Sequence, residues 1–438
     1  MKGTPDEPRF SVELLEGSAA LRDVIDKHIR DQTLALKSAF LVADLGVIVR
    51  QQVRWRAEMD QIRPFYAVKS NSSPVVIEIL AALGTGFVCS NKHELDLVKD
   101  FGVPSQDIIL GGTCKQLSHI KYAAKHNIPL LVCDNEVELR KIARCHPKAK
   151  VLLLLTSGSC CDREETAIPF GSTLKDCRHL LESARELSLR VTGVNCYAAS
   201  DAACVFNVML CSQIQHSQLL SFFCPPPPPN PELLVLFCAQ VNQTLKPMLD
   251  MYFPLSTGLT IIAEPGAYYV SSAFTLAVNI IAKKTVARDF SGQPHNALSA
   301  NDEPEFLYYM NDGVYGSFAS KLLCEDSISM PLAHKVSAEE PLFSSSLWGP
   351  SADDVDQVLE RCLLPELSVG DWLLFSNAGA TFSNGEEHKP PVFYSITECD
   401  WQELHNCGVT LDVRMKNFSL VPRCLQPNIS EASISTPA

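Results

Sequence analysis

The stretch that decides the fold is RPFYAVKS, residues 63–70, because it ends at a lysine where a buried strand meets a turn. Three of these residues are aromatic or β-branched, so residues 65–69 are predicted to form a short buried strand. The next residues, NSSP, turn the chain into a helix, and Pro74 suits its first turn. A lysine at the carboxyl end of a buried strand lies where (β/α)8 barrels place their chemistry. Burial lowers the pKa of such an amine, which makes Lys69 a candidate Schiff-base nucleophile; a surface lysine at a strand end is the alternative.

Strand and helix signals alternate on the carboxyl side of this stretch, which is typical of a parallel barrel or a doubly wound sheet. Strands are predicted at 65–69, Gly86–Cys89, 107–111, 129–133, Lys150–Leu155, Arg190–Tyr197 and 259–264. The intervening helices are predicted at 74–83, 92–101, 115–126, Glu136–Cys145, 174–187 and 241–251.

The alternation fails after Tyr197. Residues 211–240 contain five consecutive prolines between short apolar runs, and a polyproline II segment is incompatible with a barrel strand. Only seven barrel strands are then predicted where a closed barrel needs eight, so the barrel is expected to be incomplete around 198–240. A second hypothesis is that this segment comes from a mispredicted or alternatively spliced message.

Beyond Glu264 the pattern changes to strands divided by loops, with strands predicted at 273–283, 305–310, 341–348, 371–375 and 391–396. The predicted division is an N-terminal segment at 1–37 that contributes to the β-domain, a barrel at 38–272, a C-terminal β-domain at 273–425 and a disordered tail at 426–438.

Composition excludes several classes of function. The chain has 438 residues, 46% of them hydrophobic, which is enough for a large core. A net charge of -13 without a basic tail argues against nucleic acid as a partner. The 17 cysteines form no Cys-x-x-Cys pair, so no metal site is predicted and reduced intracellular thiols are expected. No apolar run reaches about 18 residues, so no membrane association is expected. We expect a cytoplasmic protein, with the nucleus as a second location.

Several longer motifs resemble those of the eukaryotic ornithine decarboxylases. They are FYAVK at 65–69, GTGF at 84–87, KQ at 115–116, IKYAA at 120–124, AEPG at 263–266, NDGVYGSF at 311–318 and WGP at 348–350. The resemblance covers nearly the whole chain except 211–240. It implies a TIM-like barrel of the alanine racemase and ornithine decarboxylase type with a C-terminal β-domain. The family includes catalytically inactive relatives, the antizyme inhibitors, and residues 1–3, 78–86, 318–321 and 415–418 look most like one subgroup of these.

The resemblance assigns the family's pyridoxal phosphate site residue by residue. This cofactor needs an amine, an acid at its pyridine nitrogen, a ring-stacking group and a phosphate cradle. Lys69 matches the imine lysine and Glu264 the acid. Tyr197 replaces the stacking histidine, Ala267 replaces the phosphate-binding arginine, and nothing in 211–240 resembles the glycine-rich phosphate loop. Losing three or four phosphate contacts costs on the order of 5–10 kcal/mol, so we expect that pyridoxal phosphate does not bind.

The family's substrate site is also reduced. Asp353 matches a substrate-binding aspartate, but Val88 stands where active members have an aspartate, Ala352 where they have the catalytic cysteine, and Thr381 where they have a tyrosine. No catalytic residue is therefore predicted.

The resemblance also bears on oligomerisation. Active sites of the family form between two subunits, partly through a lysine whose position holds Pro169 here, which leaves its acidic partner, Asp356, unmatched. A monomer or a weak dimer is expected.

The resemblance implies that residues 115–144 correspond to the family's antizyme-binding element. Its expected contacts are six basic residues: Lys115, Lys121, Lys125, Arg140, Lys141 and Arg144. A local basic face on an acidic chain suits an acidic partner surface, and an ordinary solvated helix face is the alternative. The predicted function is a catalytically inactive ornithine decarboxylase homologue that binds antizyme, frees the enzyme and raises polyamine synthesis and uptake. The competing prediction is an active pyridoxal-phosphate-dependent decarboxylase of putrescine biosynthesis.

Overall fold

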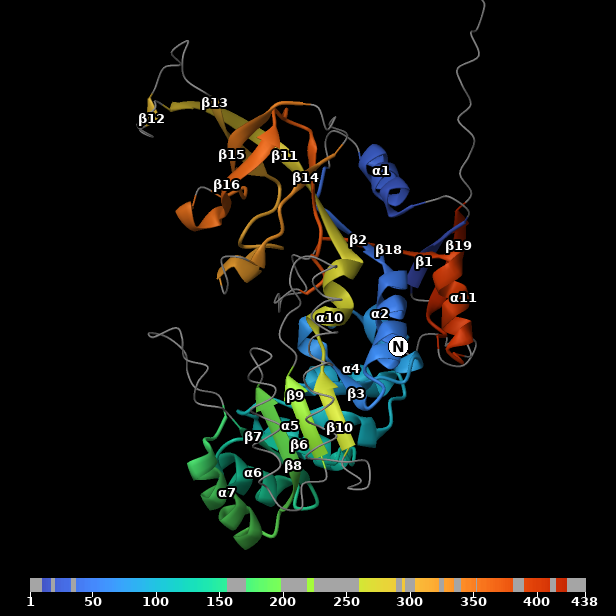
Figure 1. Cartoon of the computed structure of the whole chain (residues 1–438), viewed down its shortest axis with the longest axis vertical. Coiled ribbons are helices and arrows are strands. Elements are labelled where there is room, and N and C mark those ends of the chain that lie inside the picture. The colour runs from blue at the N-terminus through green and yellow to red at the C-terminus, as the bar shows by residue number, and fades with distance from the viewer. Residues whose placement is uncertain are drawn as a thin grey trace, which may run out of the picture.

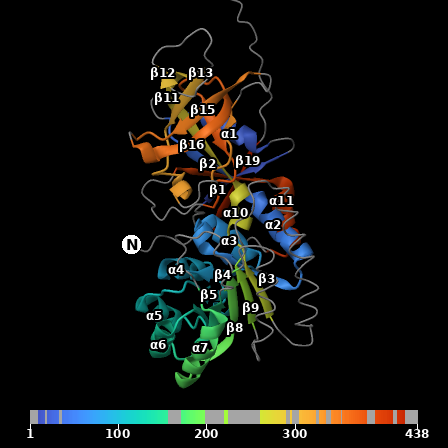
Figure 2. The same ribbon diagram turned by 60° about the vertical axis from the view of Figure 1, so that its left-hand side comes forward.

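The computed structural model describes residues 10–16, 20–32, 37–155, 171–197, 219–223, 260–288, 294–295, 304–322, 327–334, 340–351, 353–380, 390–409 and 415–423. These form an elongated molecule with a parallel barrel at one end and a mixed sheet at the other (Figures 1 and 2). The proline run, the helix expected at 241–251 and the expected tail lie outside the described residues.

Eight parallel strands close the barrel in the order β10-β3-β4-β5-β6-β7-β8-β9, which confirms the predicted fold class. The strands are β3 (Ile62–Ala67), β4 (Gly86–Cys89), β5 (Ile108–Leu110), β6 (Leu130–Cys133), β7 (Lys150–Leu155), β8 (Arg190–Tyr197), β9 (Leu219–Phe223) and β10 (Thr260–Glu264).

Strand β9 corrects the prediction that the barrel lacks a strand. It lies within 211–240 and pairs in parallel with β8 on one side and β10 on the other. Its sequence, LLSFF, is apolar at four of five positions and includes two phenylalanines, which favour strands. The strand ends before the prolines at 225–229 begin, so the prolines follow the ladder instead of interrupting it.

Helices cover the outside of the barrel, and side-chain caps begin several of them. They are α2 (Leu45–Glu58), α3 (Pro74–Ala82), α4 (Lys92–Asp100), α5 (Leu117–Lys125), α6 (Glu136–Cys145), α7 (Leu174–Glu186) and the short α10 (Ala267–Val270). Asn91 caps α4, Asn135 caps α6 and Thr173 caps α7, each accepting a hydrogen bond from a backbone N–H in the first turn. In both views α6 and α7 lie at the end of the molecule farthest from the mixed sheet.

The second lobe is an 11-stranded mixed sheet whose main path runs β16-β15-β13-β11-β2-β18-β1-β19. Its strands are β1 (Phe10–Leu15), β2 (Phe40–Asp44), β11 (Phe274–Arg288), β12 (Pro294–His295), β13 (Pro304–Met310), β14 (Leu332–Ala333), β15 (Leu342–Trp348), β16 (Gln357–Pro365), β17 (Trp372–Phe375), β18 (Val392–Thr397) and β19 (Phe418–Arg423). Helices α1 (Leu21–Asp31) and α11 (Glu398–Asn406) complete the lobe. The sequence patterns did not predict β16, β19 or α11.

Strand β2 belongs to this sheet and not to the barrel. It pairs with β11 and β18, although the predicted domain division placed residue 38 onwards in the barrel. β1 and β19, from the two ends of the described chain, also pair side by side in this sheet.

The barrel interior is a small apolar cluster of Phe65, Val88, Ile109, Val132, Leu152 and Ile262. A larger core lies between the strands and the surrounding helices. Alternate residues of each strand therefore serve two cores, which explains why the strands are apolar on both faces.

Candidate functional site

Of the two interpretations of Lys69, a buried amine and a surface lysine at a strand end, the structure supports the second. Strand β3 ends at Ala67, and a 3-10 turn, Val68–Ser70, carries Lys69 beyond the ladder. The turn breaks the alternation of inward and outward side chains, and Lys69 is exposed. The structure therefore agrees with a surface lysine at the strand end and not with a buried amine.

Glu264 is buried at the end of β10, as predicted, but it has a neighbour that the sequence analysis missed. Asn195 of β8 donates from Nδ2 to Glu264 Oε1 over 2.7 Å, and the two residues are only 4% and 5% exposed. Asn195 pairs with Ser221 of β9 and Glu264 with Phe223, so the hydrogen bond crosses β9 inside the barrel. The sequence feature that could have indicated this neighbour is the position of Asn195. It lies two residues before Tyr197 and therefore on the same face of the strand.

A second buried carboxylate, Glu94, lies near Lys69 and was also missed. Glu94 accepts hydrogen bonds from the Ser90 N–H at 2.6 Å and from Asn91 Nδ2 at 2.7 Å. Burial raises the pKa of Glu94, against the opposing effects of these hydrogen bonds and of the Lys69 charge. The positive charge of Lys69 therefore partly offsets the rise in the pKa of Glu94, a carboxylate of α4.

The residues expected to hold a phosphate do not fit one in the described part of the chain. Ala267 begins α10, whose four residues, Ala-Tyr-Tyr-Val, include no cationic side chain. Both tyrosines are buried and donate hydrogen bonds to α2, Tyr268 to the Gln51 carbonyl at 3.0 Å and Tyr269 to Gln52 Oε1 at 2.5 Å. This helix is therefore used for packing. The segment that would carry the glycine-rich loop lies outside the described residues.

The other site positions divide into three groups. Val88, at the position matched to an aspartate of active family members, packs in the apolar barrel interior. Asp353 is exposed and accepts a hydrogen bond from the Tyr315 hydroxyl. Ala352 and Thr381 lie outside the described residues, and for Tyr197 only the backbone in β8 is described.

Asp356 corrects the expectation of an unmatched interface acid. It is only 1% exposed, and its Oδ1 and Oδ2 accept hydrogen bonds from the backbone N–H groups of Val314 at 2.7 Å and Ser351 at 3.0 Å. A Cβ at Gly349 would approach its carboxylate to 2.3 Å, so this glycine makes the close packing feasible. Asp356 fastens two loops of its own chain.

Helices α5 and α6 carry the predicted antizyme-binding element. On α5, Lys121 and Lys125 are exposed at i,i+4, while Ile120 and Ala123 are buried against the barrel. On α6 the buried residues are Glu138, Leu139 and Ile142, and the exposed cations are Arg140 and Arg144.

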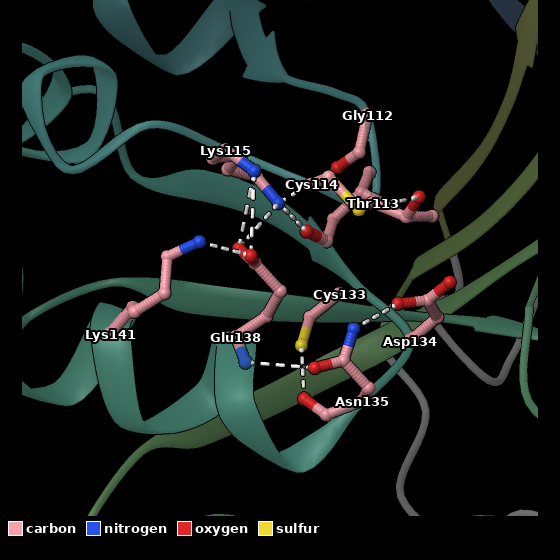
Figure 3. Close-up of polar contacts among 10 residues, drawn as sticks. Gly112, Thr113, Cys114, Lys115, Cys133, Asp134, Asn135, Glu138 and Lys141 are labelled. Atoms are coloured by element: carbon pink, nitrogen blue, oxygen red, sulfur yellow. Dashed lines mark hydrogen bonds and ion pairs between the residues drawn. The ribbon is translucent and has the colours of Figure 1, made fainter.

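Lys115 is not part of this surface, which corrects its predicted role. Helix α5 begins only at Leu117, and the Lys115 side chain is 0% exposed. Its Nζ donates to the carbonyls of Gly112, at 2.8 Å, and Val132, and lies 3.9 Å from Glu138 Oε2 (Figure 3). Burial lowers the pKa of Lys115, against the opposing charges of Cys133, Glu138 and Asp134. Lys115 thus links the β5–α5 loop to β6 and α6.

Two of the five remaining cations are paired with carboxylates of their own helix. Arg140 forms an exposed ion pair with Glu136 at 2.7 Å, and Lys141 pairs with the buried Glu138. Lys121, Lys125 and Arg144 form no ion pair with a carboxylate in the described part of the chain.

Among the described residues, no three His, Cys, Asp or Glu side chains gather closely enough to hold a metal ion. No described helix is both long enough and apolar enough to span a membrane.

Comparisons with known proteins agree with this geometry. Residues 45–209 match the family described as pyridoxal-dependent decarboxylase, pyridoxal binding domain. The whole chain is 48% identical to antizyme inhibitor 1 of Rattus norvegicus, with 100% of both chains covered. It is 40% identical to ornithine decarboxylase of Mus musculus, over 96% of this chain and 94% of that protein.

Solved structures show the same fold at lower identity. An arginine decarboxylase of Paramecium bursaria Chlorella virus, bound to agmatine, matches with a TM-score of 0.73 and 23% identity over 85% of this chain and 100% of that one. A lysine/ornithine decarboxylase of Vibrio vulnificus, complexed with cadaverine, matches with a TM-score of 0.69 and 23% identity over 85% and 98% of the two chains. The similarity that the sequence motifs indicated is confirmed.

Proposed function

We propose that this chain, which belongs to the family of ornithine decarboxylases and antizyme inhibitors, is a non-catalytic member that binds antizyme. By occupying antizyme it would release ornithine decarboxylase and so raise polyamine synthesis and uptake. The observation that carries the proposal is the similarity to antizyme inhibitor 1 over the full length of both chains.

The surface of α5 and α6 supports this proposal. Lys121, Lys125 and Arg144 are exposed cations on neighbouring helices of a chain whose net charge is -13. Their charges are not neutralised by ion pairs within the described residues. Such a patch is complementary to a partner surface rich in carboxylates and would speed the encounter with it.

The state of the cofactor site supports the absence of catalysis. Ala267 offers no donor to a phosphate, Val88 is part of an apolar cluster, and Lys69 is exposed after a turn. Glu264 already accepts a hydrogen bond from Asn195. We therefore propose that pyridoxal phosphate is not held, and that the alternative function, an active decarboxylase, does not apply.

The direct test mixes the purified chain with antizyme and ornithine decarboxylase. Added at increasing concentration, the chain should restore the decarboxylase activity that antizyme suppresses, and should itself release no CO2 from ornithine. Failure to restore activity, together with no measurable binding to antizyme, would reject the function. A stoichiometric absorbance band from bound pyridoxal phosphate, lost in Lys69→Ala, would support the active decarboxylase instead.

Reversing two exposed charges of α5 tests the location of the surface. Lys121→Glu with Lys125→Glu is expected to slow association with antizyme by about tenfold at low salt, because opposite charges steer the encounter. Surface plasmon resonance at several salt concentrations measures this rate. The matched control reverses Arg22 and Arg30, two exposed cations of α1 in the other lobe, and should leave the rate unchanged. Equal effects of the two double variants would contradict the assignment.

A further inference from the structure

The carboxylate of Glu138 has two lysine neighbours in different environments. Lys141, one turn later on α6, pairs with Oε1, and its side chain is 26% exposed. Lys115 approaches from the β5–α5 loop, with its Nζ 3.9 Å from Oε2, and is fully buried (Figure 3). The backbone N–H of Lys115 also lies 3.4 Å from each carboxylate oxygen.

This arrangement makes the two lysines unequal. The buried Lys115 ammonium donates hydrogen bonds to the carbonyls of Gly112 and Val132 and lies 3.9 Å from Glu138 Oε2, so two acceptors and one ion-pair partner fix its position. Lys141 has its side chain partly in solvent and can swing away from α6. If it did so, Glu138 would keep the ammonium and the N–H of Lys115.

A buried carboxylate without a counter-ion is strongly destabilising, whereas one that keeps a partner is tolerated. Lys141 can therefore leave Glu138 at low cost only while Lys115 stays. Without Lys115, Lys141 would be the remaining ion-pair partner of Glu138 among the described residues and would be held against the helix.

We propose that Lys115 is a positioning residue that frees Lys141 to be shared with a carboxylate of the partner protein. Lys115 does not touch the partner; it stabilises Glu138 when Lys141 turns outward. This inference rests on the proposed function, because the partner is taken to be antizyme, but its first test does not need antizyme.

That first test measures the reactivity of Lys141 toward an amine-acylating N-hydroxysuccinimide ester, by peptide mass spectrometry. In Lys115→Met, acylation of Lys141 is expected to slow by about fivefold, since its amine then stays against Glu138 and reaches the reagent less often. Adding Glu138→Gln should restore the rate, because no carboxylate then holds the lysine. Lys99→Met is the control: Lys99 also donates to its own chain, to the Val103 carbonyl and Ser105 Oγ at 3.3 Å each, but does not contact Glu138.

The second test measures affinity for antizyme. Lys115→Met and Lys141→Met should each weaken binding by about tenfold. The double variant should bind no more weakly than either, because both substitutions remove the same contribution, the contact of Lys141 with the partner. Glu138→Gln should rescue Lys115→Met but not Lys141→Met. The free energy of unfolding of each variant in urea separates a general folding defect from the positioning role, because only a folding defect lowers it in proportion to the lost affinity.

The outcomes separate the inference from the function. Unchanged Lys141 reactivity in Lys115→Met, or its failure to recover with Glu138→Gln, overturns the positioning role. Absence of antizyme binding by the unmodified chain rejects the proposed function, while the reactivity result still decides the role of Lys115.

Discussion

Lys115 illustrates how the position of a single charge depends on its surroundings. By spacing it belongs with Lys121 and Lys125, yet it precedes the first residue of α5 and lies under the loop. Lysine is the kind of residue that is almost always exposed, so sequence alone predicted exposure. Burial is stabilised by backbone carbonyls at the ends of β5 and β6, which only the folded barrel brings together.

The buried carboxyl group of Glu94 leads to a prediction about how stability depends on pH. Burial raises the pKa of Glu94 above its ordinary value of 4.5, so the folded state binds this proton more tightly than the unfolded state. The stabilisation from the neutral acid is present below the unfolded pKa and is lost as the pH rises through the folded pKa. Glu94→Gln cannot ionise and should lack this decline.

The measurement is the free energy of unfolding in urea as a function of pH. The free-energy difference between Glu94→Gln and the unmodified chain should move in favour of the variant as the pH rises from 4.5, by about 1.4 kcal/mol for each unit of the pKa difference, and then stay level. Asp353→Asn is the control, because the hydrogen bond from the Tyr315 hydroxyl lowers the pKa of this exposed carboxylate, so the corresponding difference should stay level above pH 4.5. A constant difference at all pH values would contradict the prediction.

At the scale of elements, β9 depends on the strands beside it. Its five residues pair with β8 and β10 in continuous register. The hydrogen bond from Asn195 to Glu264 joins those two neighbours across β9, on the inner side of the barrel. Glu264 matches the acid that the family places at the cofactor ring. In this structure the same carboxylate accepts a hydrogen bond that links β8 to β10.

Asn195→Asp tests this bond. Two buried carboxylates would then face each other, so one of them should be protonated in the folded state, with a raised pKa. Because the folded pKa is raised, the stability of the variant is lost as the pH rises through that pKa. At low pH the free energy of unfolding of the variant should approach that of the unmodified chain, and near pH 8 it should be about 3 kcal/mol lower. Chemical denaturation at several pH values measures this loss.

The matched control for that variant is Asn406→Asp. Asn406 donates to Glu403 over 3.1 Å in an exposed amide–carboxylate pair on α11. Solvent screens the new charge there, so the change in stability should be below about 1 kcal/mol and should depend little on pH. Similar pH profiles for the two variants would show that Asn195 and Glu264 have no special role.

For the whole molecule, the prediction concerns oligomeric state. Asp356, which the sequence analysis expected to lack its partner across a subunit interface, is engaged inside its own chain. We expect a monomer in sedimentation velocity at about 10 μM, a concentration at which a dimer with a micromolar Kd would be populated. A concentration-independent dimer would contradict this expectation.

Much of the architecture was predictable because it depends on local patterns. Alternating apolar strands and amphipathic helices predicted seven barrel strands, and the five strands predicted in the second lobe were also found there. The eighth strand was missed because a five-residue apolar run next to prolines is not distinguishable from a loop without its neighbours. The candidate surface was predictable as a run of basic residues, but the burial of Lys115 was not.

The sequence by itself determined the family, the two lobes and the replacements at Val88 and Ala267, because residue identity and periodicity are local properties. The tertiary structure decided which side chains meet. It closed the barrel through β9, joined Asn195 to Glu264, and buried Lys115 between the β5–α5 loop, β6 and α6 instead of placing it on the surface of the helix predicted at 115–126. These outcomes depend on hydrogen-bond partners and burial supplied by segments distant in the chain, which no stretch of sequence contains on its own.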